Sequence, residues 1–480
     1  MIHFFLEKAD IRKLELLRYL ENSTSRQALR EVIIKDLDVT EFLLNKMVEE
    51  INLDFEKYDL NNNFKLEASN LVVKLLKNKK CPSNQLEICL VKDSLTFSLI
   101  VALFFEEFIS INHYAENNFL SYSTVYNKLS DIRAFISKFG FTVTKKNKIK
   151  GNESNIRLFF SYIFFKVCNQ SLLVYSNNTK NKSLDLLKIL ENHREKPFKE
   201  SEKISLSHYL NVMFVRVMQH NYINNDNFYV HSQYLENNPT VLFLLEEQEK
   251  INCDIPKNKQ LSEVDELLGY AIAKELLTID NYLDNTINQN FKVYSYNFMS
   301  EVKNEFPDLT MFIDNNAPRI DLIHFNVLNF ILPFDTELKS TDTKAVTNGF
   351  PDYIEFSKNY INEQKNISEF WKNHRYFFLK YLLILINGQI TKHVDVPIYL
   401  YIDFSFGKKY TNLIMDIIKK FAGFQIVFQY FINEETNLIL SDIYFENYTE
   451  IYQIIWESAP NAKDWEEFVM GLEKLRKNTN

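Results

Sequence analysis

Glycine and proline are scarce in this chain, which has 8 and 10 of them in 480 residues. Sandwiches, barrels and phosphate-binding loops use many glycines, so the scarcity argues against them and for helices joined by short polar turns. The four cysteines have no metal-ligand spacing and no histidine close enough to complete a site: Cys81, Cys89, Cys168 and Cys253. We therefore expect reduced thiols, no metal and no other cofactor.

Long apolar segments are also missing. No uninterrupted apolar run reaches the ~20 residues needed to cross a bilayer. The N-terminal sequence MIHFFLEKADIRKLELL has no basic region followed by an apolar one, as a signal peptide would. These absences predict a cytoplasmic protein without membrane contact. Hydrophobic residues make up 46% of the chain and can fill several cores, so a chain of this length is expected to be multidomain and mainly α-helical.

The net charge of −8 argues against a nucleic-acid partner, but the distribution of charge matters more than its sum. The segment FTVTKKNKIKG, which starts at Phe141, has four lysines and no acidic residue. An isolated lysine cluster of this kind is usually a solvated loop. The residues that precede it favour a different interpretation.

The 30 or so residues before the lysines have the pattern of a helix-turn-helix. Ser110 is expected to cap a first helix, and Ser121, after a short polar turn, a second. Apolar residues of the second helix recur at i, i+4, i+7 and i+11, which is one stripe at the helical period: Val125, Leu129, Ile132 and Ile136. Gly140 is expected to end this helix.

The opposite face of the second helix is polar. Ser123, Asn127 and Ser130 lie there with Tyr126 at its edge, and such side chains can meet base edges in a major groove. Phe141 and Val143 then alternate with polar residues, and the apolar Ile149 follows the lysines of the tip. This pattern predicts a two-stranded wing whose tip touches phosphates with three lysines: Lys145, Lys146 and Lys148.

An earlier helix-turn-helix is expected nearer the N-terminus. TSRQALREVI, residues 24–33, is predicted to be an amphipathic helix, and residues 35–55 supply the turn and a second helix capped by Thr40. Its buried stripe is Leu44, Val48 and Ile51, and its opposite face carries Glu41, Phe42, Lys46 and Glu49. Because the carboxylates would be repelled by phosphates, this copy either binds DNA weakly, with Lys46 as its cation, or only positions the second copy.

Helix-turn-helix, basic wing and the heptad GNESNIR at Gly151 to Arg157 together resemble the Mga/AtxA family of virulence-type transcriptional regulators of Gram-positive bacteria. The resemblance covers the whole chain in length and domain order. It implies that this junction heptad closes the second winged helix and begins the connection to a regulatory half. The junction heptad is the more specific part of the pattern, since helix-turn-helix motifs are common.

The middle of the chain has no enzyme motif. Ser176–Ser183 has the composition of a linker, and the helical segments beyond it resemble paired PTS regulation domains with a boundary near residues 285–290. In such domains a histidine can be phosphorylated by the sugar phosphotransferase system. The candidates are His208, His220, His324 and His374, and the alternative for each is an ordinary surface or helix-end histidine.

The last segment alternates strands and helices, which predicts a parallel α/β unit. It resembles the enzyme IIB subunit of sugar permeases, where the loop after the first strand carries a phosphorylatable cysteine. Here that loop reads SFGKKY, and no cysteine follows Cys253. Phosphoryl transfer by this domain is therefore not expected. The apolar segments QIVFQYF and IYQIIW predict an assembly surface, unless they pack inside the domain.

These observations predict five domains: first helix-turn-helix 1–65, second winged helix-turn-helix 66–160, PTS regulation domains 161–287 and 288–393, and an enzyme IIB-like domain 394–480. The predicted function is that of a non-enzymatic, dimeric transcriptional regulator that binds double-stranded DNA. Its role is expected to be global or linked to virulence or carbohydrates, and its activity to be tuned by PTS phosphocarrier proteins. The alternatives are an RNA-binding antiterminator and a phosphotransferase component. Few arginine or asparagine side chains are expected to point toward the DNA groove, so recognition is expected to use DNA shape more than base sequence.

Overall fold

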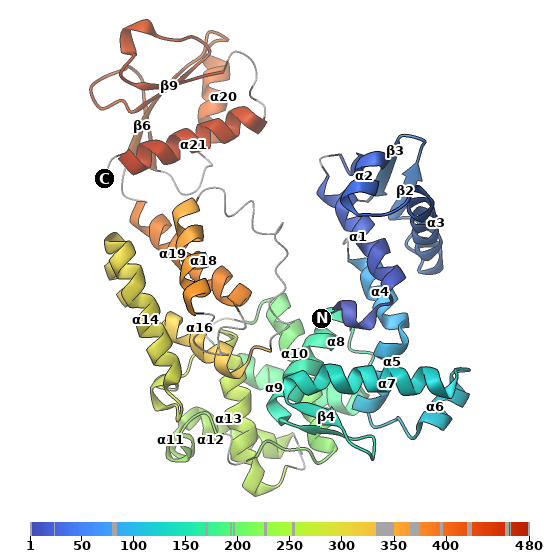
Figure 1. Ribbon diagram of the computed structural model, residues 1–480. Coiled ribbons are helices and arrows are strands. Elements are labelled where there is room, and N and C mark those ends of the chain that lie inside the picture. The colour runs from blue at the N-terminus through green and yellow to red at the C-terminus, as the bar shows by residue number, and fades with distance from the viewer. Residues whose placement is uncertain are drawn as a thin grey trace. The chain divides into compact units, whose positions relative to one another are not determined.

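The structure, a computed structural model, falls into two compact units in which helices predominate (Figure 1). The first unit is Met1–Gln289 with Phe325–Asp335, and the second is Asn290–His324 with Thr336–Asn480. The residues described are 2–23, 25–78, 84–168, 171–192, 194, 197–224, 228–251, 255–332, 350–364, 374–393, 397–419, 425–456, 460 and 462–478. The expectation of a mainly helical chain is confirmed.

The N-terminal part of the first unit is built from helices and a three-stranded antiparallel sheet. Its elements are α1 (Lys8–Asn22), β1 (Gln27–Leu29), α2 (Arg30–Asp36), α3 (Glu41–Lys57), β2 (Phe64–Ala68) and β3 (Val72–Lys77). The strand order is β1-β3-β2, and Leu66 faces Leu75 across the hairpin. Both leucines are buried, so one face of the sheet covers the helices and the other stays open.

Two details of this region differ from the sequence prediction. The helix predicted over residues 24–33 is wrong in its first half, because Gln27–Leu29 forms β1 against β3 and the helix starts only at Arg30. The division expected between residues 65 and 66 falls inside β2. Pairing of β2 and β1 with β3 joins all three strands into one sheet that ends at Lys77.

The second winged helix follows the predicted pattern closely. Its elements are α4 (Gln85–Asp93), α5 (Leu95–Phe104), α6 (Ile111–Asn117), α7 (Tyr122–Ile136), β4 (Phe141–Val143) and β5 (Ile149–Gly151). The stripe Val125, Leu129, Ile132 and Ile136 is fully buried. Gly140 ends the helical segment with φ 81°, a left-handed conformation that glycine adopts without strain. The capped helix pair and the wing are confirmed.

Helices α8 to α13 continue the described part of the first unit. They are α8 (Glu153–Cys168), α9 (Asn177–Asn192), α10 (Glu200–Met218), α11 (Ser232–Asn237), α12 (Pro239–Lys250) and α13 (Lys257–Ala273). The linker predicted at Ser176–Ser183 is wrong, because this segment opens α9. The Ser176 hydroxyl accepts a hydrogen bond from the Thr179 backbone N–H at 3.2 Å, and Thr179 and Ser183 are buried. Small polar residues here cap and pack a helix.

The second unit begins with another helical region. Its helices are α14 (Asn290–Glu305), α15 (Thr310–Asn315), α16 (Ala317–Asn329), α18 (Pro351–Gln364) and α19 (His374–His393), and α16 belongs to this unit as far as His324. The break between the units after Gln289 lies within the range 285–290 where the sequence suggested a boundary.

A four-stranded parallel sheet with two helices ends the chain. The elements are β6 (Pro397–Asp403), α20 (Lys408–Ile418), β7 (Gln425–Gln429), β8 (Leu438–Ser441), β9 (Tyr452–Ile455) and α21 (Ala462–Asn478), with strand order β7-β6-β8-β9. The predicted parallel α/β unit is confirmed. The expectation that IYQIIW is exposed is wrong for its inward-facing residues, because Ile454 and Trp456 join the hydrophobic core of this sheet.

Candidate nucleic-acid interface

Helix α7 is fixed in place by its cap and by its buried stripe. The Ser121 hydroxyl accepts a hydrogen bond from the Thr124 backbone N–H at 3.1 Å, which satisfies one of the free donors of the first turn. The preceding helix α6 is capped in the same way by Ser110, which accepts from His113 N–H at 3.2 Å. The N-termini of both helices are therefore set by local hydrogen bonds, and the outer face of α7 is free to contact a ligand.

The outer face of α7 carries the four side chains that the sequence singled out. Ser123, Tyr126, Asn127 and Ser130 are all exposed, and they share this face because the buried stripe occupies the opposite one. Their hydroxyl and amide groups are donors and acceptors of the kind that bind base edges. This surface can therefore enter a major groove.

Two aromatic residues of this surface were missed. Tyr122 is 54% exposed and stacks on Tyr126 with ring centroids 6.1 Å apart, and Phe119 in the turn before α7 is 98% exposed. The i, i+4 spacing of the tyrosines is visible in the sequence and could have indicated the pair. Nothing in the sequence distinguishes the exposed Phe119 from a core phenylalanine.

The wing presents its lysines unequally. Lys145 and Lys146 are exposed at the tip, and among the described residues neither has an ion pair. The tip is closed by a hydrogen bond from the Thr144 backbone N–H to the Lys148 carbonyl oxygen at 2.8 Å. Lys148 forms an ion pair with Glu106. The expectation that all three lysines are uncompensated is therefore wrong for Lys148, because the chain brings an acid from the loop before α6 to the wing.

The first helix-turn-helix has a different outer face. Thr40 caps α3 as predicted, accepting from Leu43 N–H at 3.2 Å. Glu41 pairs with Arg30, and the Lys46 ammonium lies 3.7 Å from Glu50. The one cation predicted for this face is therefore partly neutralised, and α3 offers little positive potential to a phosphate backbone.

Residues 79–164, which include α6, α7, the wing and the start of α8, match the family model described as the Mga helix-turn-helix domain. This segment, the Mga domain of the chain by similarity, is thus like an Mga helix-turn-helix domain. The match supports membership of the chain in the Mga/AtxA-type regulator family, whose helix-turn-helix domain points to a DNA-binding regulator. None of the curated proteins matches the chain.

The junction heptad forms the end of the wing and the beginning of α8 within the Mga domain. Gly151 has φ 146°, and a Cβ atom there would lie 2.4 Å from the Gly140 carbonyl oxygen, so only glycine fits. Asn152 accepts a hydrogen bond from the Asn155 backbone N–H, and the Asn155 amide donates to the Phe139 carbonyl oxygen at 2.8 Å. The heptad thus ties the wing to the short 3-10 helix Ser137–Phe139 that follows α7.

The charged residues of the heptad enter a buried ion cluster. Arg157, which is fully buried, donates to both carboxylate oxygens of Glu263 on α13 at 2.6 and 2.9 Å. Glu153 accepts two hydrogen bonds from Arg216 on α10 at 3.0 and 2.8 Å. Arg216 also donates to the Ile149 carbonyl oxygen of β5 at 3.3 Å. The wing, α8, α10 and α13 therefore share one hydrogen-bonded cluster.

The cluster continues on the other side of α8. The Ser154 hydroxyl donates to Glu266 at 2.7 Å, and the Tyr229 hydroxyl donates to the second oxygen of the same carboxylate at 2.8 Å. Burial raises the pKa of Glu266 above its usual value, while these hydrogen bonds act against that rise. Hydroxyl donors thus help to hold this carboxyl inside the helical core.

Two of the histidine candidates are buried. His208 is fully buried, and its Nδ1 lies 3.1 Å from the Tyr175 hydroxyl. His324 is also fully buried, and its Nε2 lies 2.7 Å from the Tyr381 hydroxyl. Burial lowers the pKa of His324 to about 4, so its ring is neutral near pH 7. A phosphocarrier protein could not reach either ring without local opening of the helices.

The other two candidates are placed differently. His220 is exposed just after α10, where its φ is 57° and its Nδ1 lies 3.1 Å from the Tyr222 hydroxyl. His374 begins α19, but its side chain lies outside the described part of the chain. His220 is thus the accessible ring among the three candidates whose side chains are described.

Proposed function

We propose that this protein is a cytoplasmic transcriptional regulator that binds double-stranded DNA through the outer face of α7 and the tip of the wing. The observation that carries the proposal is the combination, within the Mga domain, of a capped helix with an exposed polar face and a wing with two lysines that have no ion pair among the described residues. Side chains on α7 would contact base edges, and Lys145 and Lys146 would contact phosphates. Among the described residues, no helix is both long and apolar enough to cross a membrane.

Substitution on the two helix-turn-helix copies tests this assignment. The triple variant Ser123→Ala, Asn127→Ala, Ser130→Ala should weaken duplex binding by about 1–3 kcal/mol for each base contact that is lost. The matched triple variant Phe42→Ala, Lys46→Ala, Glu49→Ala should lose much less, because the cation of α3 is already paired with Glu50. Fluorescence anisotropy with duplex DNA measures both, with folding checked by circular dichroism.

The same titration separates the alternatives. Greater sensitivity of the α3 variant would reverse the ranking of the two copies. An RNA-binding antiterminator would bind single-stranded RNA in preference to duplex DNA. The helix-turn-helix pairs in the N-terminal part of the chain favour binding to duplex DNA over binding to RNA.

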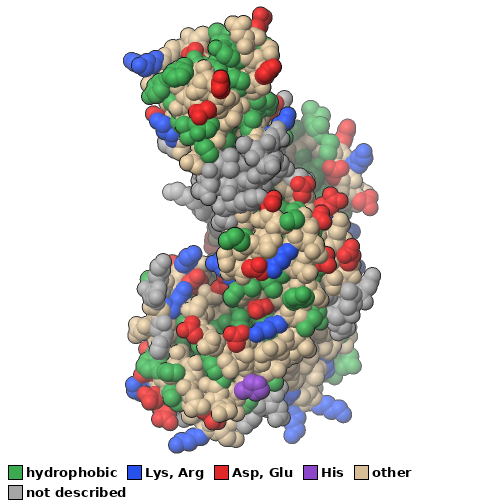
Figure 2. All heavy atoms as spheres, turned by 90° about the vertical axis from the view of Figure 1, so that its left-hand side faces the viewer, with side chains coloured by type: hydrophobic (Ala, Val, Ile, Leu, Met, Phe, Trp, Pro, Cys, Tyr) green, Lys and Arg blue, Asp and Glu red, His purple; other side chains and the backbone are tan. Residues whose placement is uncertain are grey.

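We also propose that the α/β region from residue 394 onward resembles enzyme IIB subunits and joins two copies of the chain. Strand β7 is an edge of the sheet, and the aromatic residues after it are exposed, Tyr430 at 93% and Phe431 at 70%. Hydrophobic side chains are visible on one face of this region (Figure 2). A second copy would cover such an edge, and dimerisation would raise DNA affinity through effective concentration.

Truncation before Val394 is expected to convert a dimer into a monomer and to weaken DNA binding while leaving the winged helices folded. Sedimentation velocity at micromolar concentration measures the assembly state. A truncated chain that remains fully dimeric would place assembly in the helical regions instead.

Control by PTS phosphocarrier proteins, and a role in virulence or carbohydrate response, are proposals that rest on the family resemblance. The loop after β6 contains Ser405 in place of a cysteine, and the Ser405 backbone N–H donates to Asp442 at 2.8 Å. A serine hydroxyl is a weaker nucleophile than a thiolate, which argues against a phosphotransferase role for this region. The accessible ring of His220 is the best described site for such control.

A further inference from the structure

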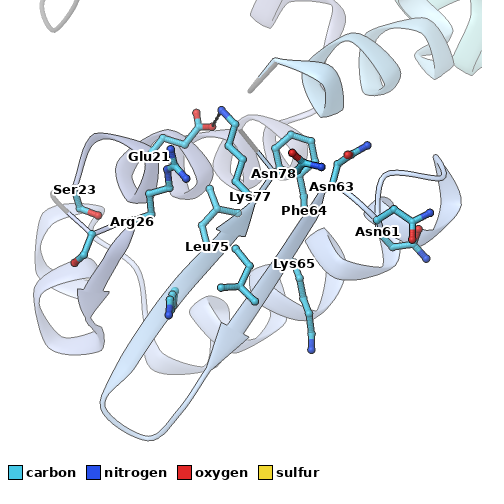
Figure 3. Close-up of a pocket in the computed structure, with 14 residues that line it drawn as sticks. Glu21, Ser23, Arg26, Asn61, Asn63, Phe64, Lys65, Leu75, Lys77 and Asn78 are labelled. Atoms are coloured by element: carbon cyan, nitrogen blue, oxygen red, sulfur yellow. Dashed lines mark hydrogen bonds and ion pairs between the residues drawn. The ribbon is translucent and has the colours of Figure 1, made fainter. Parts of the chain in front are cut away.

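The first helix-turn-helix and the three-stranded sheet of the same region, residues 2–78, form a first winged helix that carries a group of cations beside its sheet. A groove of about 780 Å³ lies at the base of the β2–β3 hairpin (Figure 3). Its lining residues come from the end of α1, the segment before β1, the α3–β2 turn and the two strands. They include four cations, one carboxylate and four asparagines: Arg26, Lys65, Lys74, Lys77, Glu21, Asn61, Asn62, Asn63 and Asn78.

The cations of this groove are only partly neutralised. Lys77 is paired with Glu21 at 3.1 Å, as the dashed line in Figure 3 shows, and Lys65 lies 3.5 Å from Glu67. Arg26 and Lys74 have no ion pair among the described residues. The groove therefore keeps a positive potential, whereas the outer face of α3 does not.

The strand register holds two of these cations on the open face of the sheet. Residues alternate between the two faces of a strand, so Lys65 on β2 and Lys74 on β3 point away from the buried Leu66 and Leu75. Both lysines are exposed. Arg26 is fixed beside them because its carbonyl oxygen accepts a hydrogen bond from the Leu75 backbone N–H at 2.8 Å. The arrangement is therefore set by the fold of the sheet.

We infer that this groove binds the phosphate backbone of duplex DNA, and that the first winged helix holds DNA through it and reads no bases. Lysine and arginine neutralise phosphates, and asparagine amides donate hydrogen bonds to phosphate oxygens. These contacts are independent of base sequence. The inference rests on the proposed function, since it assigns the first winged helix a part in binding the same duplex.

The test uses the full chain and two mixed-sequence duplexes of equal length. The second duplex keeps the segment that the Mga domain protects in footprinting, and its base order is shuffled outside that segment. The double variant Arg26→Gln, Lys74→Gln should lower the salt dependence of log K by about 0.9 for each lost phosphate contact, so by about 1.8 in total. The reduction should be the same on both duplexes. Lys65→Gln should add less to this reduction, because Lys65 already lies 3.5 Å from Glu67.

Two controls make the comparison specific. Lys46→Gln on α3 should leave the salt dependence unchanged, because that lysine is near Glu50. Lys188→Gln with Lys250→Gln removes two exposed lysines from α9 and α12, and it should also have no effect. Circular dichroism checks that all variants fold.

A groove variant with the salt dependence of the Lys188/Lys250 control would overturn the inference and leave the groove to another acidic partner. A loss that depends on the shuffled sequence would also overturn it, because a base-reading surface behaves in that way. If the unaltered protein bound neither duplex, the proposed function itself would fail.

Discussion

Arg157→Met should destabilise the first unit by about 3–5 kcal/mol, the usual cost of removing one partner of a buried ion pair. Glu263 is fully buried and would lose the guanidinium that donates two hydrogen bonds to it. Urea denaturation followed by circular dichroism should show an earlier transition. All three tryptophans follow Thr336 in the sequence, and Trp456 and Trp465 lie in the described part of the second unit, so the tryptophan fluorescence transition should not move.

A second substitution tests whether the lost ion pair causes this destabilisation. Arg157→Met with Glu263→Gln removes both charges, and the glutamine oxygen can still accept the Ile223 backbone N–H that Glu263 accepts at 2.8 Å. This double variant should be more stable than Arg157→Met alone, so its loss of stability should be smaller than the sum of the two single losses in the double-mutant cycle. The matched surface control is Lys188→Met, whose exposed pair with Asp185 should contribute less than about 1 kcal/mol. Additive losses would show that packing around Arg157, and not its charge, is responsible.

Replacing Lys145 and Lys146 with glutamine should weaken binding to every duplex sequence. Both lysines are exposed at the wing tip, and neither has an ion pair among the described residues. If each contacts one phosphate, the slope of log K against log salt should fall by about 1.8. Anisotropy titrations at several salt concentrations measure this slope.

Lys148→Gln is the matched control on the same wing. Lys148 already pairs with Glu106, so its removal should release fewer counterions and change the slope less. An unchanged slope in the Lys145/Lys146 variant would mean that the wing does not contact phosphates. A larger effect of Lys148→Gln would mean that its pair with Glu106 opens when DNA binds.

The sequence by itself determined the second winged helix. Its caps, the stripe from Val125 to Ile136, the glycine stop and the wing strands all depend on residues within about 40 positions of one another. Over such distances, local hydrogen bonds and the helical spacing of apolar residues decide the structure, and both are visible in the order of residues. Strands β6, β7 and β8 of the C-terminal sheet were predicted for a similar reason, since β-branched and aromatic runs between turns indicate strands.

The tertiary structure alone decided the parts that depend on distant partners. Residues 27–29 have a helical pattern but form β1, because the edge of β3 offers them backbone hydrogen bonds. Lys148 is neutralised by an acid 42 positions away. The charged residues of the junction heptad bind Arg216 and Glu263, which are 63 and 106 positions from their partners in the heptad. Burial and electrostatic energy depend on separation in space, which the spacing of residues along the chain does not give.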